Sequence, residues 1–248
     1  MKHIAYQLYC SRNAASLNST LRMLSEVGYK AVEGYGGILG DVGAVKRGLD
    51  ENELIMPSAH MGIDEIEADP ADAISTAKAL NLTSVFAPFL MPDDRPSDAA
   101  GWAAFGKRLA EAGKPIQDAG FTFGWHNHDF EFMATETGEM PIDLIAQASD
   151  DLQLELDLGW VARAGLDPVA WVNKYAGRIA AAHIKDIAPA GECLDEDGWA
   201  DVGHGTQNWG EIHAACQAAG VDHYVIEHDN PSDDARFASR SLTAVSNF

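Results

Sequence analysis

The feature that most constrains the fold of this chain is an alternation of short apolar strands with helices, repeated eight times. Short apolar runs predict the strands, and apolar residues at helical spacing predict the helices between them. Strands are expected at 3–9, 30–34, 54–60, 82–89, 121–126, 152–157, 178–184 and 223–227. Helices are expected at 16–27, 42–52, 70–80, 98–119, 141–148, 168–175, 209–219 and 233–245. The 248 residues provide about 31 for each strand–helix unit, a natural length for it.

This strict alternation favours a parallel sheet with helices outside it. Eight units favour closure into one α/β domain over residues 1–248, a (β/α)8 TIM barrel with its active-site residues at the C-terminal ends of the strands. An open, doubly wound sheet is the alternative. No GxGxxG motif follows the first strand, and the glycines after Glu33 lack the spacing of a dinucleotide-binding turn.

Charged or imidazole side chains stand at six of the eight expected strand ends. They are Glu33, His60, the cluster His126 to Glu131, Asp157, His183 with Lys185 and Asp186, and Glu227 with His228 and Asp229. Each one alone has a structural explanation, such as a turn cap, a core histidine or a solvated rim. In a barrel these ends face one another, and imidazole with carboxylate suits a divalent metal ion. Side chains alternate along a strand, so His126 and His128 are expected on the same side.

The charge balance limits the partners of this chain. It has 17 basic and 38 acidic residues, a formal charge of −21, which opposes binding to nucleic acid and to anionic membranes. Three scattered cysteines do not form a disulfide framework or a CxxC metal site. We see no secretory signal and no apolar run long enough to span a membrane, and we expect a cytoplasmic protein.

Seven stretches make the chain resemble a known family. They are TLRMLSEVGYKAVEGYG (20–36), SAHMG (58–62), HNHDFEF (126–132), ELDLGWVARAGLDPVAWV (155–172), AAHIKDI (181–187), DVGHGTQNW (201–209) and YVIEHD (224–229). The resemblance is to the xylose isomerase-like barrel superfamily, and within it to the sugar phosphate isomerase/epimerase proteins. Such a superfamily contains epimerases, isomerases, dehydratases, lyases and an endonuclease, so the resemblance implies the fold more sharply than the activity.

The resemblance implies a metal site with one ligand from each of four strands. Carried over, three of the ligands are Asp157, His183 and Glu227. On the fifth strand many relatives have a glutamate where this chain has His126. Either His126 takes that place, or Glu131 folds back to supply a carboxylate. We favour Glu131, because three carboxylates and one imidazole suit Mn²⁺ or Mg²⁺, whereas His126 as a ligand suits Zn²⁺ or Co²⁺ better.

The reaction expected from the resemblance is isomerisation or epimerisation of a ketose or keto-sugar through an enediolate. Glu227 is expected to bind the metal and serve as base, with His126 or His128 as the partner acid. Lys185 is expected to hold an oxyanion or hydroxyl. Substrate contacts are expected from Glu33, His60, Trp125 and His204, although Trp125 also fits a core position and His204 a plain glycine turn.

Three other functions stay open on the sequence alone. A keto-sugar or 3-keto-glycoside lyase or dehydratase can use the same site, and a barrel without catalysis can bind a sugar or a protein. An endonuclease IV-like nuclease is disfavoured by the charge and by Trp160, where such enzymes carry a further histidine. A homo-oligomer, or a second subunit at the barrel mouth, is a further expectation. No arginine cluster follows the late strands, which favours a non-phosphorylated sugar.

Overall fold

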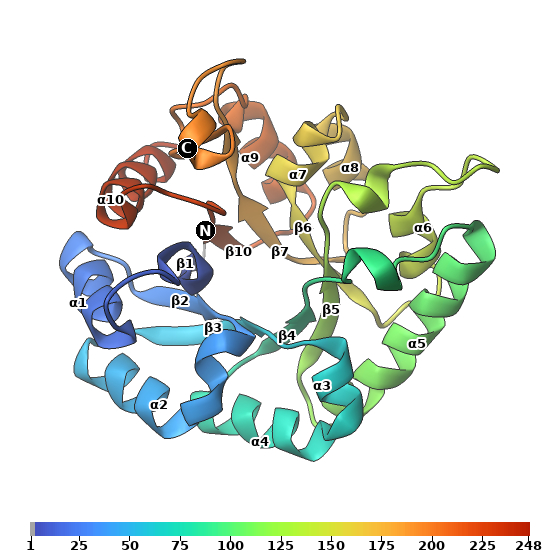
Figure 1. The fold of residues 1–248 in the computed structure, drawn as a ribbon, viewed down its shortest axis with the longest axis horizontal. Coiled ribbons are helices and arrows are strands. Elements are labelled where there is room, and N and C mark those ends of the chain that lie inside the picture. Colours follow the sequence, from blue (N-terminus) through green and yellow to red (C-terminus); the bar gives the residue numbers. More distant parts are fainter. Residues whose placement is uncertain (1–2) are drawn as a thin grey trace.

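A computed structural model describes residues 3–248 and shows a closed barrel of eight parallel strands (Figure 1). The strands follow one another around the barrel in chain order, and the last closes against the first through the pair Ile4 and Tyr224. They are β1 (His3–Gln7), β2 (Ala31–Gly34), β3 (Ile55–His60), β4 (Ser84–Ala87), β5 (Thr122–His126), β6 (Gln153–Asp157), β7 (Ile179–Ile184) and β10 (His223–Ile226). The predicted (β/α)8 barrel is confirmed, and the open sheet is excluded.

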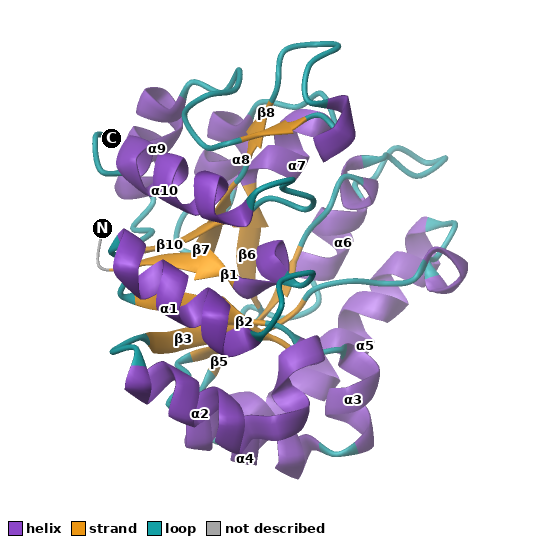
Figure 2. Cartoon of the chain, turned by 60° about the vertical axis from the view of Figure 1, so that its left-hand side comes forward, coloured by secondary structure: helices purple, strands orange, loops and turns teal. Residues whose placement is uncertain are grey.

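Helices surround the barrel on the outside (Figures 1 and 2). Those predicted are α1 (Leu17–Val27), α2 (Val42–Glu51), α4 (Pro70–Leu80), α5 (Ala99–Asp118), α6 (Pro141–Ala146), α8 (Pro168–Lys174), α9 (Trp209–Ala218) and α10 (Asp234–Val245). Local chemistry sets their ends: the Ser16 hydroxyl accepts from the Ser19 N–H to begin α1, and Gly28, with φ of 114°, ends it.

Several short elements were not predicted. Two helices, α3 (Ile63–Ala68) and α7 (Leu158–Arg163), follow β3 and β6. The 3₁₀ helices are η1 (Leu8–Ser11), η2 (Gly36–Asp41), η3 (Pro92–Asp94), η4 (Phe130–Phe132) and η5 (Leu194–Glu196). Each is only one or two turns long, too short to show a helical period in the sequence. All of them come after strands, so they shape the mouth of the barrel.

A two-stranded hairpin, β8 (Asp186–Ile187) with β9 (Trp199–Ala200), stands beyond the end of β7 (Figure 2). The carboxylate of Asp186 organises the loop that follows it. It accepts from the backbone N–H groups of Gly203, Gly205 and Gln207 and from the indole of Trp209. Asp186 is therefore a loop-fixing residue and not part of the site, although it follows a strand end.

Strand alternation separates an apolar outer layer from a polar interior at the C-terminal end of the barrel. On β6, Leu154 and Leu156 belong to the main hydrophobic core, whereas Glu155 and Asp157 alternate with them and meet the histidines of neighbouring strands. Helices pack closely on the outer layer, and a Cβ atom at Gly113 of α5 would lie 1.9 Å from the Phe123 ring. Among residues 3–248, no helix is long and apolar enough to cross a membrane.

Candidate metal and substrate site

Four strands bring four possible metal ligands together inside the barrel mouth. His126 ends β5, Asp157 ends β6, His183 lies on β7, and Glu227 follows β10. One nitrogen or oxygen atom from each of them can be chosen so that all four lie within 4.8 Å of one another, and all four residues are buried. The backbone register sets this arrangement, because Asp157 pairs with His183 across β6 and β7. The four residues span positions 126 to 227 and stand on four neighbouring strands, whose C-terminal ends the curvature of the barrel turns toward one another.

The donor set fits a divalent cation. Asp157 Oδ2 is buried without a hydrogen-bond partner, and His126 Nε2 lies 4.0 Å from it. On the other side of the group, His183 Nδ1 lies 2.8 Å from Glu227 Oε2. Burial raises the pKa of Asp157 to about 7, although Lys185 opposes the shift. A buried carboxylate oxygen without a donor, facing two imidazoles and a second carboxylate, is the environment that a metal ion of borderline softness satisfies.

Lys185 neutralises the acidic side of this group. Its Nζ lies 2.7 Å from Asp229 Oδ1, 3.3 Å from Glu227 Oε2 and 3.7 Å from Asp157 Oδ2. The ammonium also lies over the ring of Trp160, at 4.8 Å. Burial opposes its charge, but the three carboxylates raise its pKa. Lys185 is 1% exposed and does not line the cavity, so the structure places it beside the donor group, where it balances charge.

A second polar layer lies beneath the imidazoles. Glu155 Oε2 is 2.5 Å from His60 Nε2 and 3.1 Å from His126 Nδ1, while Glu33 Oε1 is 2.8 Å from His183 Nε2. Gln7 donates to Glu33 over 2.8 Å. Glu155 was not among the site residues predicted from the sequence. Its place two residues before Asp157 in LQLELD nevertheless puts both side chains on the same face of β6.

This layer changes the interpretation of Glu33. It is fully buried, engaged by Gln7, Ser58, His60 and His183, and absent from the lining of the cavity. The prediction that Glu33 contacts a substrate hydroxyl is therefore corrected, because the imidazoles separate it from the mouth. Burial opposes its charge, but the surrounding histidines lower its pKa, so it is a buried anion among imidazoles.

Glu131 lies away from the donor group. Its Oε1 accepts from the Trp125 indole at 2.8 Å and its Oε2 from the His128 backbone N–H at 2.8 Å. The 3₁₀ helix η4 carries Glu131, and it folds back toward β5 as anticipated, but onto the outer face of the strand. Burial raises its pKa to about 8. The strand-five member of the donor group is therefore His126 and not Glu131.

Trp125 and His204, both predicted as substrate contacts, lie outside the lining of the cavity. Trp125 is fully buried, packs at 5.1 Å between ring centroids against Phe105 of α5, and is absent from the cavity lining. It alternates with His126 and so faces the helices. His204 is exposed on the loop held by Asp186 and does not line the cavity either.

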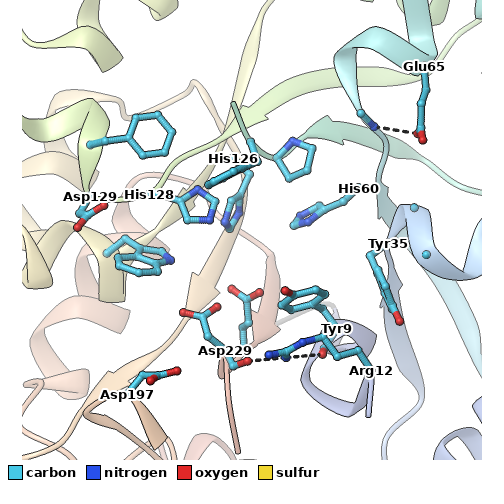
Figure 3. A pocket seen from close by; sticks show the side chains of 18 of the residues that line it. Tyr9, Arg12, Tyr35, His60, Glu65, His126, His128, Asp129, Asp197 and Asp229 are labelled. Carbon is cyan, nitrogen blue, oxygen red and sulfur yellow. Dashed lines mark hydrogen bonds between the residues drawn. The ribbon is translucent and has the colours of Figure 1, made fainter. Parts of the chain in front are cut away.

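A cavity of about 670 Å³ opens above the donor group (Figure 3). His60, His126, His128 and Glu227 reach its wall, so four of the predicted site residues line it. Aromatic rings and two arginines make up much of the remaining wall: Tyr9, Tyr35, Phe89, Phe130, Trp160, Arg12 and Arg95. They stand on the loops and short helices that follow the strands, where no long periodic pattern marks them in the sequence.

The histidines of the cavity differ in charge because their neighbours differ. Burial alone would lower the pKa of His60, but Glu155 and Glu33 outweigh it and raise the pKa to about 10. For His128, burial together with Lys185 outweighs Glu227 and lowers the pKa to about 3. The His128 ring lies among apolar rings, 5.0 Å from Phe89 and 5.3 Å from Trp160. A charged and a neutral imidazole therefore face the same cavity.

Solved structures of other proteins share this fold. A sugar phosphate isomerase/epimerase from Parabacteroides distasonis aligns with a TM-score of 0.81 and 19% identity, over 98% of this chain and 93% of that one. The IolI protein, solved with a bound zinc atom, aligns with a TM-score of 0.79 and 14% identity, over 99% and 97% of the two chains. At these identities the likeness establishes the fold.

Two comparisons rest on sequence. An inosose dehydratase from Clostridium beijerinckii is 33% identical over 88 residues, which are 35% of this chain and only 28% of that protein. The family model described as "Xylose isomerase-like TIM barrel" matches residues 21–245, which covers nearly the whole barrel. The chain belongs to the xylose isomerase-like TIM barrel family.

Proposed function

We propose that this protein is a divalent-metal-dependent isomerase or epimerase of a ketose or keto-sugar. The observation that carries the proposal is the convergence of His126, Asp157, His183 and Glu227 at the base of a cavity. A metal ion held there would polarise a substrate carbonyl and stabilise the enediolate left when the neighbouring proton is removed. The polar base and aromatic walls of the cavity suit a sugar-like molecule, which has hydroxyl groups and apolar C–H faces.

The proposed ligand set has two imidazoles and two carboxylates. This set replaces our first preference, Glu131, with His126, because both Glu131 oxygens are engaged elsewhere. Mixed nitrogen and oxygen donors suit Zn²⁺ and Co²⁺ as well as Mn²⁺, and they favour Mg²⁺ less. Manganese, our initial choice, is therefore one of three metals to be tested. The zinc atom bound in the IolI structure, a protein of the same fold, supports a divalent ion as the metal of this site.

Proton transfer is assigned to the groups that line the cavity. Glu227 reaches its wall and stays ionised, because Lys185 and His183 outweigh burial and lower its pKa, so it is the proposed base. His60 is the proposed acid, because Glu155 and Glu33 raise its pKa to about 10 against burial, so that the ring, which reaches the cavity, carries a second proton on Nδ1 besides the Nε2–H held by Glu155. His128, a neutral imidazole, is proposed to donate a hydrogen bond to a substrate hydroxyl. Lys185 keeps the charge of the carboxylates balanced.

Solvent deuterium exchange tests this proposal. The purified protein is stripped of metal, reconstituted with Mn²⁺, Co²⁺ or Zn²⁺, and incubated in D₂O with ketoses and 3-keto-glycosides. We expect metal-dependent exchange at the carbon next to the carbonyl, abolished by EDTA and by Glu227→Gln. Exchange that ignores EDTA and Glu227→Gln would contradict the mechanism. A protein without bound metal and without turnover would support the alternative of a binding barrel.

Dehydration is a second candidate, favoured by the local similarity to an inosose dehydratase. Loss of a β-hydroxyl needs the same enediolate and a proton donor to the leaving group, and His60 can supply that proton. Mass spectrometry of the exchange mixtures separates the two reactions. Isomerisation or epimerisation leaves the product with the mass of the substrate, apart from the deuterium label. Dehydration removes one molecule of water.

A further inference from the structure

We propose that Glu155 is a positioning residue that fixes which nitrogen of His126 is free to bind the metal. The inference rests on the metal site of the proposed function, but its main test needs no metal. Glu155 is fully buried on β6, two residues before Asp157, and does not line the cavity. Its Oε2 atom is surrounded by imidazole nitrogens from three different strands.

The distances define the arrangement. Glu155 Oε2 lies 2.5 Å from His60 Nε2, 3.1 Å from His126 Nδ1 and 3.2 Å from His183 Nε2. Its other oxygen, Oε1, is buried with no hydrogen-bond partner. Among residues 3–248, the hydrogen-bond partners of this carboxylate are thus all imidazoles.

Acceptance by Glu155 determines the tautomer of His126. A carboxylate oxygen accepts, so the His126 Nδ1 that faces it carries the hydrogen. A neutral imidazole has one N–H, which leaves the lone pair on Nε2. Nε2 is the nitrogen on the side of Asp157, 4.0 Å from the unpartnered Oδ2. Glu155 therefore directs the free nitrogen of His126 into the donor group, as carboxylates behind metal-bound histidines do.

A second inner carboxylate, Glu33, orients His183 in the same way. Its Nε2 donates to Glu33 Oε1 at 2.8 Å, and Glu155 Oε2 lies nearby. Its Nδ1 faces Glu227 Oε2 at 2.8 Å. His126 directs its Nε2 to the donor group, whereas His183 directs its Nδ1 there. In both rings the other nitrogen carries an N–H that faces an inner carboxylate.

An inner metal ion is the competing explanation. One atom each from His60, His126, Glu155 and His183 can also be chosen within 4.8 Å of one another. Ligands that bind one ion at about 2.0–2.2 Å lie roughly 3 Å or more apart. The 2.5 Å between His60 Nε2 and Glu155 Oε2 is the length of a short hydrogen bond, and it lies further below that spacing than the 2.8 Å between His183 Nδ1 and Glu227 Oε2 of the proposed ligand set. The geometry therefore points to a hydrogen-bonded carboxylate.

The direct test reads the tautomer of His126 in metal-free protein. Long-range ¹H–¹⁵N NMR distinguishes protonated from unprotonated imidazole nitrogens, and His126→Asn assigns the signals. We expect His126 protonated at Nδ1 in the wild type. Glu155→Gln has nearly the same shape but only one acceptor atom and a new N–H₂ donor, so we expect it to lose this tautomer preference. A wild-type His126 protonated at Nε2 overturns the proposal without any variant.

Metal affinity is the second readout. Loss of a carboxylate behind a metal-bound histidine typically costs 10–100-fold in affinity, so we expect Glu155→Gln to weaken Zn²⁺ binding by about that factor. Glu155→Asp keeps the charge, and it should preserve the tautomer and restore part of the affinity. Glu131→Gln is the matched control: it is another fully buried, hydrogen-bonded carboxyl, but it contacts no ligand nitrogen. It should leave both the His126 tautomer and the Zn²⁺ affinity unchanged.

The outcomes separate this inference from the proposed function. Two Zn²⁺ ions per wild-type chain, with one lost in Glu155→Gln, would replace the positioning role by an inner metal site. If a folded Glu155→Gln protein kept both the His126 tautomer and the Zn²⁺ affinity of the wild type, the positioning role of Glu155 would be refuted. If the wild type binds no divalent ion, the proposed function fails, while the tautomer measurement still decides whether Glu155 orients His126.

Discussion

Asp157 Oδ2 and His126 Nε2 face each other across 4.0 Å from the ends of neighbouring strands, and no hydrogen bond joins them. Lys185 Nζ, at 3.7 Å, is the charged group beside that oxygen. Two ligands of one ion, each about 2.1 Å from it, are separated by about 3–4 Å. The spacing between these two atoms therefore suits a shared metal ion better than a direct contact.

Asp157→Asn is expected to abolish metal binding and leave the barrel folded. The amide retains the oxygen that accepts from the Trp160 N–H and caps α7, at 2.9 Å in the wild type. It removes the charge from a group that burial already disfavours as an anion. We expect metal content near zero by elemental analysis and turnover reduced at least about 100-fold, since Lewis-acid assistance contributes several kcal/mol.

His204→Ala is the companion variant for this test. His204 is exposed and outside the cavity, so its metal content and turnover should stay within about twofold of wild type, the scale of a surface substitution. A large loss of turnover in His204→Ala would mean that its loop closes over the substrate. An Asp157→Asn protein that retains one tightly bound ion would exclude the proposed ligand set.

Metal affinity should rise with pH in a defined way. Burial raises the pKa of Asp157 to about 7, and the carboxylates around His183, against burial, raise its pKa as well. Both groups hold protons at pH 6 that a metal ion must displace, so affinity should increase on the order of 100-fold per pH unit there. Above pH 7 Asp157 is ionised, and the slope should fall to about tenfold per unit. Competition with a chelator whose own pH dependence is known measures the metal affinity. An affinity that does not change between pH 6 and 8 would contradict the assignment of Asp157 and His183 as ligands.

Glu131 should make the metal-free protein less stable as pH rises. Its pKa is about 8 in the fold against 4.5 ordinarily, so below pH 4.5 both the folded and unfolded states are protonated. Between 4.5 and 8 the unfolded state releases the proton and the folded state keeps it, which favours unfolding. Glu131→Gln removes this loss. In urea unfolding, the free energy of unfolding of the variant relative to wild type should improve by about 4 kcal/mol from pH 4.5 to pH 8.

If the difference in unfolding free energy between Glu131→Gln and wild type stayed constant across that pH range, Glu131 would ionise in the folded protein as it does in the unfolded one. The absolute stability of Glu131→Gln is not the test, because its amide must face either the Trp125 indole or the His128 N–H with a donor. The ionisation of the buried carboxyl is measured only by how the difference in unfolding free energy between Glu131→Gln and wild type changes with pH.

The barrel and the strand ends were predictable because they follow from period and topology. Alternation of strands and helices defines a parallel barrel, and the adjacent strands β6, β7 and β10 bring Asp157, His183 and Glu227 together at their C-terminal ends. Glu155 was equally accessible, since it shares a strand face with Asp157. A pattern of strand ends does not single it out, because Glu155 lies one layer beneath the end of β6.

The choice between His126 and Glu131 could not be made from the sequence. Chemical preference favoured a carboxylate, but the turn of η4 decides where Glu131 points, and five residues of loop allow either side of β5. The lining of the cavity was hidden for a similar reason. Tyr35, Arg12 and Arg95 lie on loops after strands, and only the folded chain shows that they meet over one cavity.

Two tryptophans, one in the core and one in the cavity, should separate stability from substrate binding. Trp125→Phe keeps an aromatic ring against Phe105 but leaves Glu131 Oε1 without its donor, so we expect a loss of about 1–3 kcal/mol in unfolding free energy with KM unchanged. Trp160 lines the cavity, and Trp160→Phe should raise KM about threefold to tenfold with a smaller effect on stability, since a ring stacking contact contributes about 0.5–1.5 kcal/mol. Urea unfolding and steady-state kinetics of both variants check this. If Trp125→Phe raised KM and left stability unchanged, the assignment of Trp125 to the helix-facing core would be wrong, and the substrate would have to reach the outer side of β5.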